Sequence, residues 1–399
     1  MEEGRDEAKR ELLARRRQDK VKGALTVFAG FLMNMVRAPQ AAGSVNAWGT
    51  ISVYVASYYH HFDSNVDLGT MFVVYPVSAF FEGVGFSNAH TVMGVIMYHA
   101  VGSRVTGAAA GLTYALTFLA CAYIPNAYLF AGVYGVMTGV ATGLSTFTPV
   151  WPAWEFFPKN QGLVAGLIVF GYGLSPALFG IGFTYLINPT NKPATLEVSR
   201  GATHDRLFTY DVAQHLPYAL RVMSLVFAVL YIVSVPLLFK ASNKKKLGVQ
   251  DSISSLMSQN VRRNVRECPD MATVLRSQAF WVLLLGLFVG SSYGIYIINA
   301  YKNFGMLHIH NDRTLSLIGS IASVANAFGR MLLPIILDYV SFKVSYCVNS
   351  VAQIVVAATL ALTVTNQYWY CLWISLSFVL FAGNFTGFAI EAGRIFGPK

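Results

Sequence analysis

Of the charged side chains inside apolar stretches of the sequence, three stand out as needing a chemical reason. Arg330 stands near the middle of the apolar run 315–343, and Glu82 and Glu391 stand in two other runs. A guanidinium in the hydrocarbon core of a bilayer costs at least about 2.5–3.5 kcal/mol and stays charged. Arg330 must therefore face a polar interior, a carboxylate or a ligand. Binding of an anion is the first candidate chemistry, and pairing of Arg330 with an acid or with helix carbonyls is the alternative.

The two glutamates suggest proton chemistry or ion pairing. A carboxyl group in a low-dielectric environment binds a proton more readily than it does in water. Glu82 and Glu391 are therefore candidate proton carriers for a symporter, or candidate partners of Arg330. Glu391 lies within two turns of the end of its apolar run, so the alternative is that its carboxylate reaches water.

Motifs for catalysis, cofactor binding and metal binding are missing from the sequence. It contains no HExxH motif, no Walker loop, no Ser-His-Asp set and no carboxylate pair in a catalytic context. The cysteines at 121, 268, 347 and 371 have no CxxC spacing, so we expect thiols rather than metal or redox sites. An enzyme is not expected, and neither is a cofactor or a metal.

The composition is that of a polytopic membrane protein. Of 399 residues, 55% are hydrophobic and only 12% are charged, and the mean hydropathy is +0.50. A soluble domain has about a quarter of its residues charged. The net charge of +10 does not indicate nucleic-acid binding, because the basic residues cluster between apolar runs and match no nucleic-acid module.

A window of about twenty apolar residues finds ten candidate membrane spans. The first two are longer than a bilayer requires, so each is expected to be broken or to carry an insertion. The spans are 23–59, 68–97, 105–124, 127–150, 161–187, 217–239, 278–301, 315–337, 344–364 and 368–392.

Basic residues in the loops give the expected orientation. With a cytoplasmic N-terminus, 21 of the 29 Lys and Arg residues fall in cytoplasmic segments and five fall in outer loops, among them Lys302. This asymmetry follows the positive-inside rule and places both termini in the cytoplasm. We expect four parts: a basic N-terminus (1–22), a six-helix bundle (23–239), a basic cytoplasmic loop (240–277) and an incomplete C-terminal bundle of four helices (278–399).

Several motifs in order resemble one transporter family. The segment 156–173 contains FFPKNQGLVAGL followed by GYG, and 43–49 reads GSVNAWG; further matches are 301–305 (YKNFG), 326–330 (NAFGR) with Asp338, and 383–385 (GNF) with 396–399 (FGPK). The chain after residue 22 resembles the oxalate/formate antiporter family and the related monocarboxylate transporters of the major facilitator superfamily. The resemblance implies an all-α fold of two pseudo-symmetric helical bundles. It also implies secondary active transport of small organic anions by alternating access, as an antiporter or as a proton symporter.

The resemblance also implies which residues line the central cavity. Arg330 would bind the substrate carboxylate through its planar fork, and aromatic rings would surround the rest of a small anion. For each aromatic residue, ordinary packing between helices is the alternative. The expected substrate-binding residues beside Arg330 are Trp48, Tyr54, Tyr75, Trp151, Tyr172, Tyr293, Tyr296 and Asn299.

A second group of residues is expected to shape the conformational change. A weak internal repeat relates 94–104 to 334–343, at the inner ends of the second and eighth spans, which suggests two related halves. Glycines in the fifth span leave room for close helix packing, and they would let helices slide. The expected structural residues are Gly94, Gly102, Arg104, Gly162, Gly166, Gly171, Gly173, Gly329 and Asp338.

Three departures from the family pattern keep other functions open. Tyr98 stands where the superfamily usually has Asp, residues 36–42 look inserted, and the final FGPK resembles the loop before the eleventh helix. About ten helices are therefore expected, with the eleventh and twelfth apparently missing. The alternatives are a non-transporting, receptor-like relic of the fold and an amino-acid carrier. The expected partners are a small anion, protons in the case of a symporter, and the lipid bilayer of the plasma membrane or an organelle; we expect a monomer.

Overall fold

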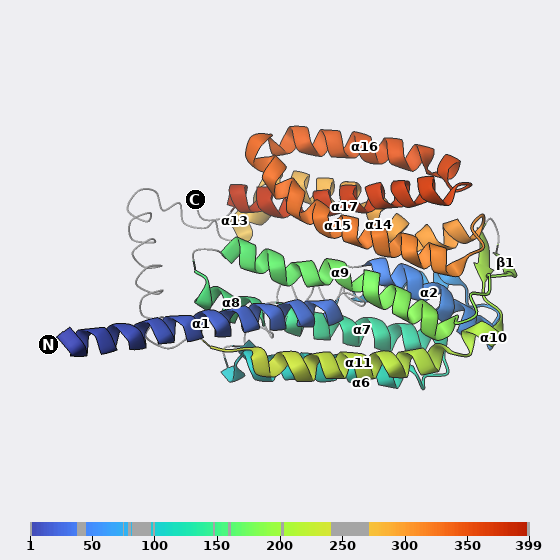
Figure 1. The fold of residues 1–399 in the computed structure, drawn as a ribbon. Helices are drawn as coiled ribbons and strands as arrows, with labels where there is room; N and C mark the ends of the chain where they lie inside the picture. Colours follow the sequence, from blue (N-terminus) through green and yellow to red (C-terminus); the bar gives the residue numbers. More distant parts are fainter. Residues whose placement is uncertain are drawn as a thin grey trace.

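The computed structural model describes residues 2–37, 45–74, 76–78, 81, 97–98, 100–146, 148–158, 161–200, 203–240 and 271–396. The fold is all-α apart from one small hairpin, as expected from the sequence. Most helices run side by side along one common direction (Figure 1). The N-terminal half (2–240) and the C-terminal half (271–396) occupy opposite sides of the molecule. They meet where α9 of the first half packs along α15 of the second.

The N-terminal half contains most of the short elements. Its helices are α1 (Glu2–Arg37), α2 (Val45–His60), α3 (Leu68–Phe72), α6 (Ser103–Cys121), α7 (Ala127–Ser145), α8 (Val150–Phe156), α9 (Gln161–Ile187), α10 (Tyr210–Ala213), α11 (Leu216–Ser234) and the 3-10 turn η1 (Val235–Leu237). The apolar stretch 23–59 is thus formed by two helices, α1 and α2. Most of the predicted second span, 68–97, lies outside the described residues.

The C-terminal half is built from four long helices and one short one. They are α13 (Met271–Arg276), α14 (Gln278–Met306), α15 (Asp312–Tyr339), α16 (Phe342–Thr363) and α17 (Gln367–Phe396). Each long helix covers one of the predicted spans to within one residue, and α14 continues five residues beyond the predicted end at 301. Large apolar side chains on α14 and α16, such as Phe288 and Ile354, are exposed, as expected for helix surfaces that contact lipid.

Five helical stretches of the described part are long and apolar enough to cross a membrane. They are Ala127–Phe156, Leu163–Ile187, Tyr210–Leu237, Gln278–Met306 and Phe342–Thr363. The antiparallel hairpin of β1 (Leu196–Arg200) and β2 (Thr203–Leu207) lies at one end of the molecule with α10. We call this the hairpin end; the N-terminus, α8 and α13 lie at the opposite end, the α8 end (Figure 1).

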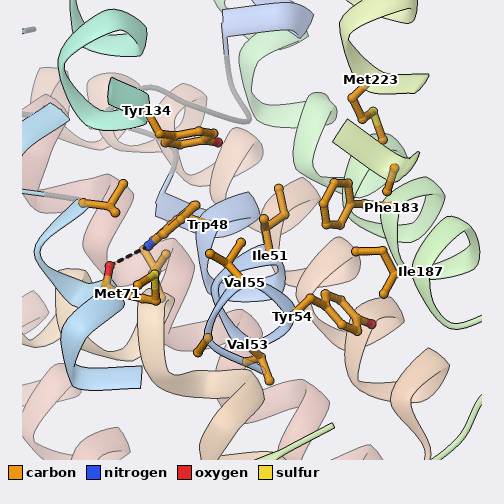
Figure 2. Close-up of a cluster of buried hydrophobic side chains, with 14 of the residues drawn as sticks. Trp48, Ile51, Val53, Tyr54, Val55, Met71, Tyr134, Phe183, Ile187 and Met223 are labelled. Carbon is orange, nitrogen blue, oxygen red and sulfur yellow. Dashed lines mark hydrogen bonds between the residues drawn. The ribbon is translucent and has the colours of Figure 1, made fainter. Parts of the chain in front are cut away.

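The centre of the N-terminal half is the apolar cluster around α2 that Figure 2 shows. The ring of Trp48 lies 5.0 Å from that of Tyr134 on α7, and its indole Nε1 donates to the carbonyl of Met71 at 3.3 Å. Farther along α2, the ring of Tyr54 lies 6.2 Å from that of Phe183 on α9. These contacts fix α2 between α7 and α9, so its other face meets the C-terminal half.

Two residues of the predicted structural motif determine how α6 begins. Gly102 is the N-cap of α6 with a φ of +87°, a left-handed conformation that glycine adopts without the steric penalty of a Cβ. Arg104 donates from Nε to the carbonyl of Leu238 at 2.9 Å and from Nη2 to that of Pro236 at 3.0 Å. Its guanidinium also stacks over Phe239. Arg104 therefore caps the chain that follows α11.

Arg104→Ala is expected to lower the unfolding free energy by about 1–2 kcal/mol, because the last carbonyls of this segment lose a charged donor. Thermal unfolding of the purified protein in detergent measures the loss. Arg221→Ala is the matched control, since Arg221 donates within its own helix to Pro217 and stacks over Tyr123 at the surface. Equal melting temperatures for the two variants would contradict the capping role.

Candidate functional site

A stripe of polar side chains follows one face of α15 where this helix packs along α9. Asp312 and Arg330 are eighteen residues apart, which is five turns of about 3.6 residues, so both lie on the same face about 27 Å apart along the axis. The polar residues between them on this face are all buried: Ser316, Ser320, Ser323 and Asn326. Such a stripe inside a membrane protein must face protein, water or a ligand rather than lipid.

Arg330, at one end of the stripe, is half-buried and is held from two sides. Its Nε donates to Oδ1 of Asn326 at 3.1 Å, and the amide of Asn326 donates to the carbonyl of Phe378 on α17 at 2.7 Å. The Arg330 guanidinium lies 5.3 Å from the ring centre of Tyr172 on α9. The structure therefore brings together two of the expected substrate-binding residues, one from each half.

Two of the buried polar atoms that have no hydrogen-bond partner within the described residues belong to helices at the interface between the halves. One is Oδ1 of Asn299 on α14, whose amide nitrogen donates to its own helix at Ile295; the other is the hydroxyl of Ser175 on α9. Buried polar groups are almost always hydrogen-bonded, by water or ligand if not by protein. These two atoms are therefore available to form a hydrogen bond with water or with a ligand.

The remaining expected aromatic residues do not gather around Arg330. Trp48 packs in the core of the N-terminal half (Figure 2). The ring of Trp151 lies 4.9 Å from that of Tyr98, and Tyr293 is hydrogen-bonded to Ser377 at 3.0 Å.

Tyr296 is 64% exposed, on the outer face of α14. Its position is about 200° around the helix from the buried Ile298, so it does not line the interface between the halves.

Of the two expected intramembrane acids, one is described. Glu391 is half-buried on α17 and lies 3.8 Å from Arg394 one turn later. Glu82, Tyr75 and Gly94 lie outside the described residues, as do the surroundings of Gly162 and of the Asp338 side chain.

The glycines of α9 differ from one another in their surroundings. A Cβ at Gly171 would overlap the carbonyl oxygen of Phe31 on α1, within the N-terminal half. A Cβ at Gly173 would overlap the Cβ of Ala327 on α15. A Cβ at Gly166 would meet nothing within 4 Å. On α15, Gly329 lies close to Val379 of α17. Close helix approach therefore needs glycine at 171 and 173, and not at 166.

At the other end of the stripe lies a buried ion pair that we did not expect from the sequence. Nζ of Lys302 lies 2.8 Å from Oδ1 of Asp312, and the two side chains are 0% and 1% exposed. Lys302 was expected in an outer loop. That expectation is wrong, because α14 continues to Met306 and turns Lys302 inward, towards α2 and α15.

The N-terminal half supplies the other partners of this ion pair. The hydroxyl of Tyr54 on α2 donates to Oδ2 of Asp312 at 2.6 Å and accepts from Lys302 at 2.9 Å. The amide of Asn188, just after α9, donates to the same Oδ2 at 2.7 Å. Nζ of Lys302 lies 4.3 Å from the ring centre of Tyr54. Two charges of one half are thus covered by polar groups of the other.

Further contacts join the halves around the ion pair. Thr184 of α9 is hydrogen-bonded to Ser316 at 2.6 Å, and Thr50 of α2 to Tyr301 at 2.7 Å. Nearer the hairpin, Asn303 donates to Asp205 at 2.9 Å. The hairpin end is therefore bridged in this structure by several contacts from α2, α9 and β2 to α14 and α15.

Comparisons with known proteins agree with this architecture. Over 94% of its length the chain is 23% identical to apicoplast pyruvate carrier 1 of Toxoplasma gondii, covering 78% of that protein. Over 79% of its length it is 22% identical to the uncharacterized MFS-type transporter YhjX of Escherichia coli K12, covering 69% of it. No protein-family model matches the chain.

Solved transporter structures have the same fold. The xylose transporter XylE from E. coli, in a partially occluded inward-open conformation, aligns with a TM-score of 0.59 at 12% identity, covering 93% of this chain and 86% of that one. The nucleoside transporter NupG aligns with a TM-score of 0.59 at 11% identity, covering 94% and 81%. The chain is therefore a multi-pass membrane protein with the fold of the major facilitator superfamily and with sequence similarity to MFS-type transporters.

Proposed function

We propose that the protein is a secondary carrier of small organic anions of the monocarboxylate type, and that Arg330 binds the substrate carboxylate. The observation that carries this proposal is the position of Arg330, a permanent charge on the interface between the two halves. Because Arg330 contacts both halves, binding of an anion to it can be coupled to the relative movement of the halves. The name of the Toxoplasma relative, a pyruvate carrier, supports the same substrate class.

The surroundings of Arg330 suit a small planar anion. Asn326 fixes the guanidinium from its Nε side, and Asn326 is itself fixed by α17. A guanidinium oriented in advance loses less conformational entropy when it binds a carboxylate. The ring of Tyr172 covers the charge from the side of the N-terminal half. The hydroxyl of Ser175, one turn after Tyr172 on α9, is a buried polar group that can donate to an anion.

We propose that transport proceeds by alternating access of this site to the two sides of the membrane. The distribution of basic residues favours a cytoplasmic N-terminus, so the hairpin end would face away from the cytoplasm. The contacts around Lys302 and Asp312 then close the outer side. The substrate site would communicate with the cytoplasmic side in this conformation.

Uptake into proteoliposomes tests the proposal. Vesicles loaded with unlabelled pyruvate are expected to accumulate labelled pyruvate, formate or lactate by counterflow, while protein-free vesicles do not. An excess of neutral amino acids is expected to leave the uptake unchanged; inhibition by them would favour an amino-acid carrier. No counterflow with any small carboxylate, from protein that is folded and inserted, would contradict the proposal.

The same vesicles distinguish the two coupling modes. Accumulation into empty vesicles driven by an imposed inward proton gradient indicates symport. A strict requirement for an anion inside the vesicle indicates exchange.

A further inference from the structure

We propose that Tyr54 and Asn188 of the N-terminal half act as a clamp on the Lys302–Asp312 ion pair of the C-terminal half, and that this clamp is the gate that opens and closes the hairpin end. The inference rests on the alternating access proposed above and names the contacts that must break in each cycle. It concerns residues about five helical turns from Arg330 on the same face of α15.

The division of the contacts between the halves carries the inference. The ion pair joins α14 to α15, so it can stay intact when the two halves separate. The contacts that must break are the hydroxyl and the amide donated from α2 and from the end of α9. Water can replace both donors once the hairpin end opens, because the charges then become solvated. In the closed state the same charges are buried from water, and the clamp supplies their hydrogen bonds from the N-terminal half.

Burial distinguishes this clamp from an exposed ion pair at the same end. Lys192 and Asp211, an ion pair within the N-terminal half, are 52% and 44% exposed, and such surface pairs contribute little. Lys302 and Asp312 are fully buried, and a buried charge that loses its partner is strongly destabilising. Changes at the clamp should therefore shift the balance between closed and open states far more than changes at the exposed pair.

A cross-link between the halves measures that balance without any substrate. Asn303 on α14 and Asp205 on β2 are hydrogen-bonded at 2.9 Å across the interface. In a protein whose native cysteines are replaced by serine, Asp205→Cys and Asn303→Cys should cross-link readily with a short bifunctional thiol reagent. The rate of cross-linking then reports how often the hairpin end is closed.

Two substitutions in this background test the clamp. Tyr54→Phe keeps the ion pair and removes its bridging hydroxyl; one lost hydrogen bond to a charge should slow cross-linking about tenfold. Asp312→Asn leaves Lys302 unpaired in the dry closed state only, so it should slow cross-linking about tenfold or more and expose the interface to water-soluble thiol reagents. Asp211→Asn, which breaks the exposed pair, should leave the rate within about twofold of the parent.

The results separate the gate from the transport proposal. Parental cross-linking in both Tyr54→Phe and Asp312→Asn overturns the gate, whatever the transport assays show. If Asp312→Asn does not fold, Tyr54→Phe decides alone, and an unchanged rate in that variant overturns it. If cross-linking is slowed in these variants but the parent protein transports none of the tested anions, the gate is supported and the substrate class is rejected.

Discussion

Arg330→Lys should yield folded, membrane-inserted protein that has lost most of its transport of small carboxylates. Lysine keeps the positive charge but lacks the planar pair of donors that fits a carboxylate. It also loses the hydrogen bond from Nε to Asn326 and the stacked position beside Tyr172. We expect the initial rate of uptake to fall about ten- to a hundredfold. Uptake measured at several substrate concentrations should show a raised KM first, since binding is the affected step.

The alternative role for Arg330, one half of a structural ion pair, predicts a different set of results. Removing one member of a buried pair costs about 3–5 kcal/mol, so Arg330→Gln would misfold and a second neutral change at the partner would rescue it. Glu391 is the described acid that the sequence suggested as partner, and it lies 3.8 Å from Arg394 instead. If Arg330 binds substrate, as we propose, Arg330→Gln protein should fold and fail to transport. Recovery of transport by adding Glu391→Gln would refute substrate binding by Arg330.

The sequence predicted the fold and one end of the polar stripe, because both depend on local signals. Apolar runs gave the helices, and a charge inside such a run identified Arg330. The ring on α9 that lies beside it, Tyr172, was reached through the family motif. Tyr296 shows the limit of that route: a resemblance identifies the helix that lines a cavity, but the face of the helix is decided by rotation. Tyr296 and Ile298 are two residues apart, and one is exposed while the other is fully buried.

The other end of the stripe was missed for a physical reason. Lys302 and Asp312 stand beside a predicted loop, where charged residues ordinarily meet water, and a hydropathy window ends a helix at the first such residue. The pair becomes visible only when α14 is extended by one turn and α15 starts at Asp312 behind its Asn311 cap. The partners from the other half, Tyr54 and Asn188, are more than a hundred residues away in the sequence, and no local pattern connects them.

Alanine at Gly49 should open the hairpin end by crowding the interface between the halves. A Cβ at Gly49 of α2 would overlap the carbonyl oxygen of Ile298 on α14, four residues from Lys302. Crowding of a packed interior costs about 1–3 kcal/mol. This cost falls on the closed state alone, because the two halves separate when the end opens. We expect slower cross-linking between positions 205 and 303, by about tenfold, and a clear change in transport rate.

Two glycines on α9 provide matched controls for this effect. Gly171→Ala crowds Phe31 on α1, inside the N-terminal half, so it should lower the melting temperature without changing the cross-linking rate. Gly166→Ala meets no neighbour within 4 Å and should be neutral, or stabilising by up to about 1 kcal/mol through helix propensity. If Gly171→Ala and Gly49→Ala changed cross-linking equally, the contact between α2 and α14 would be part of a rigid core, and the halves would have to separate along another surface.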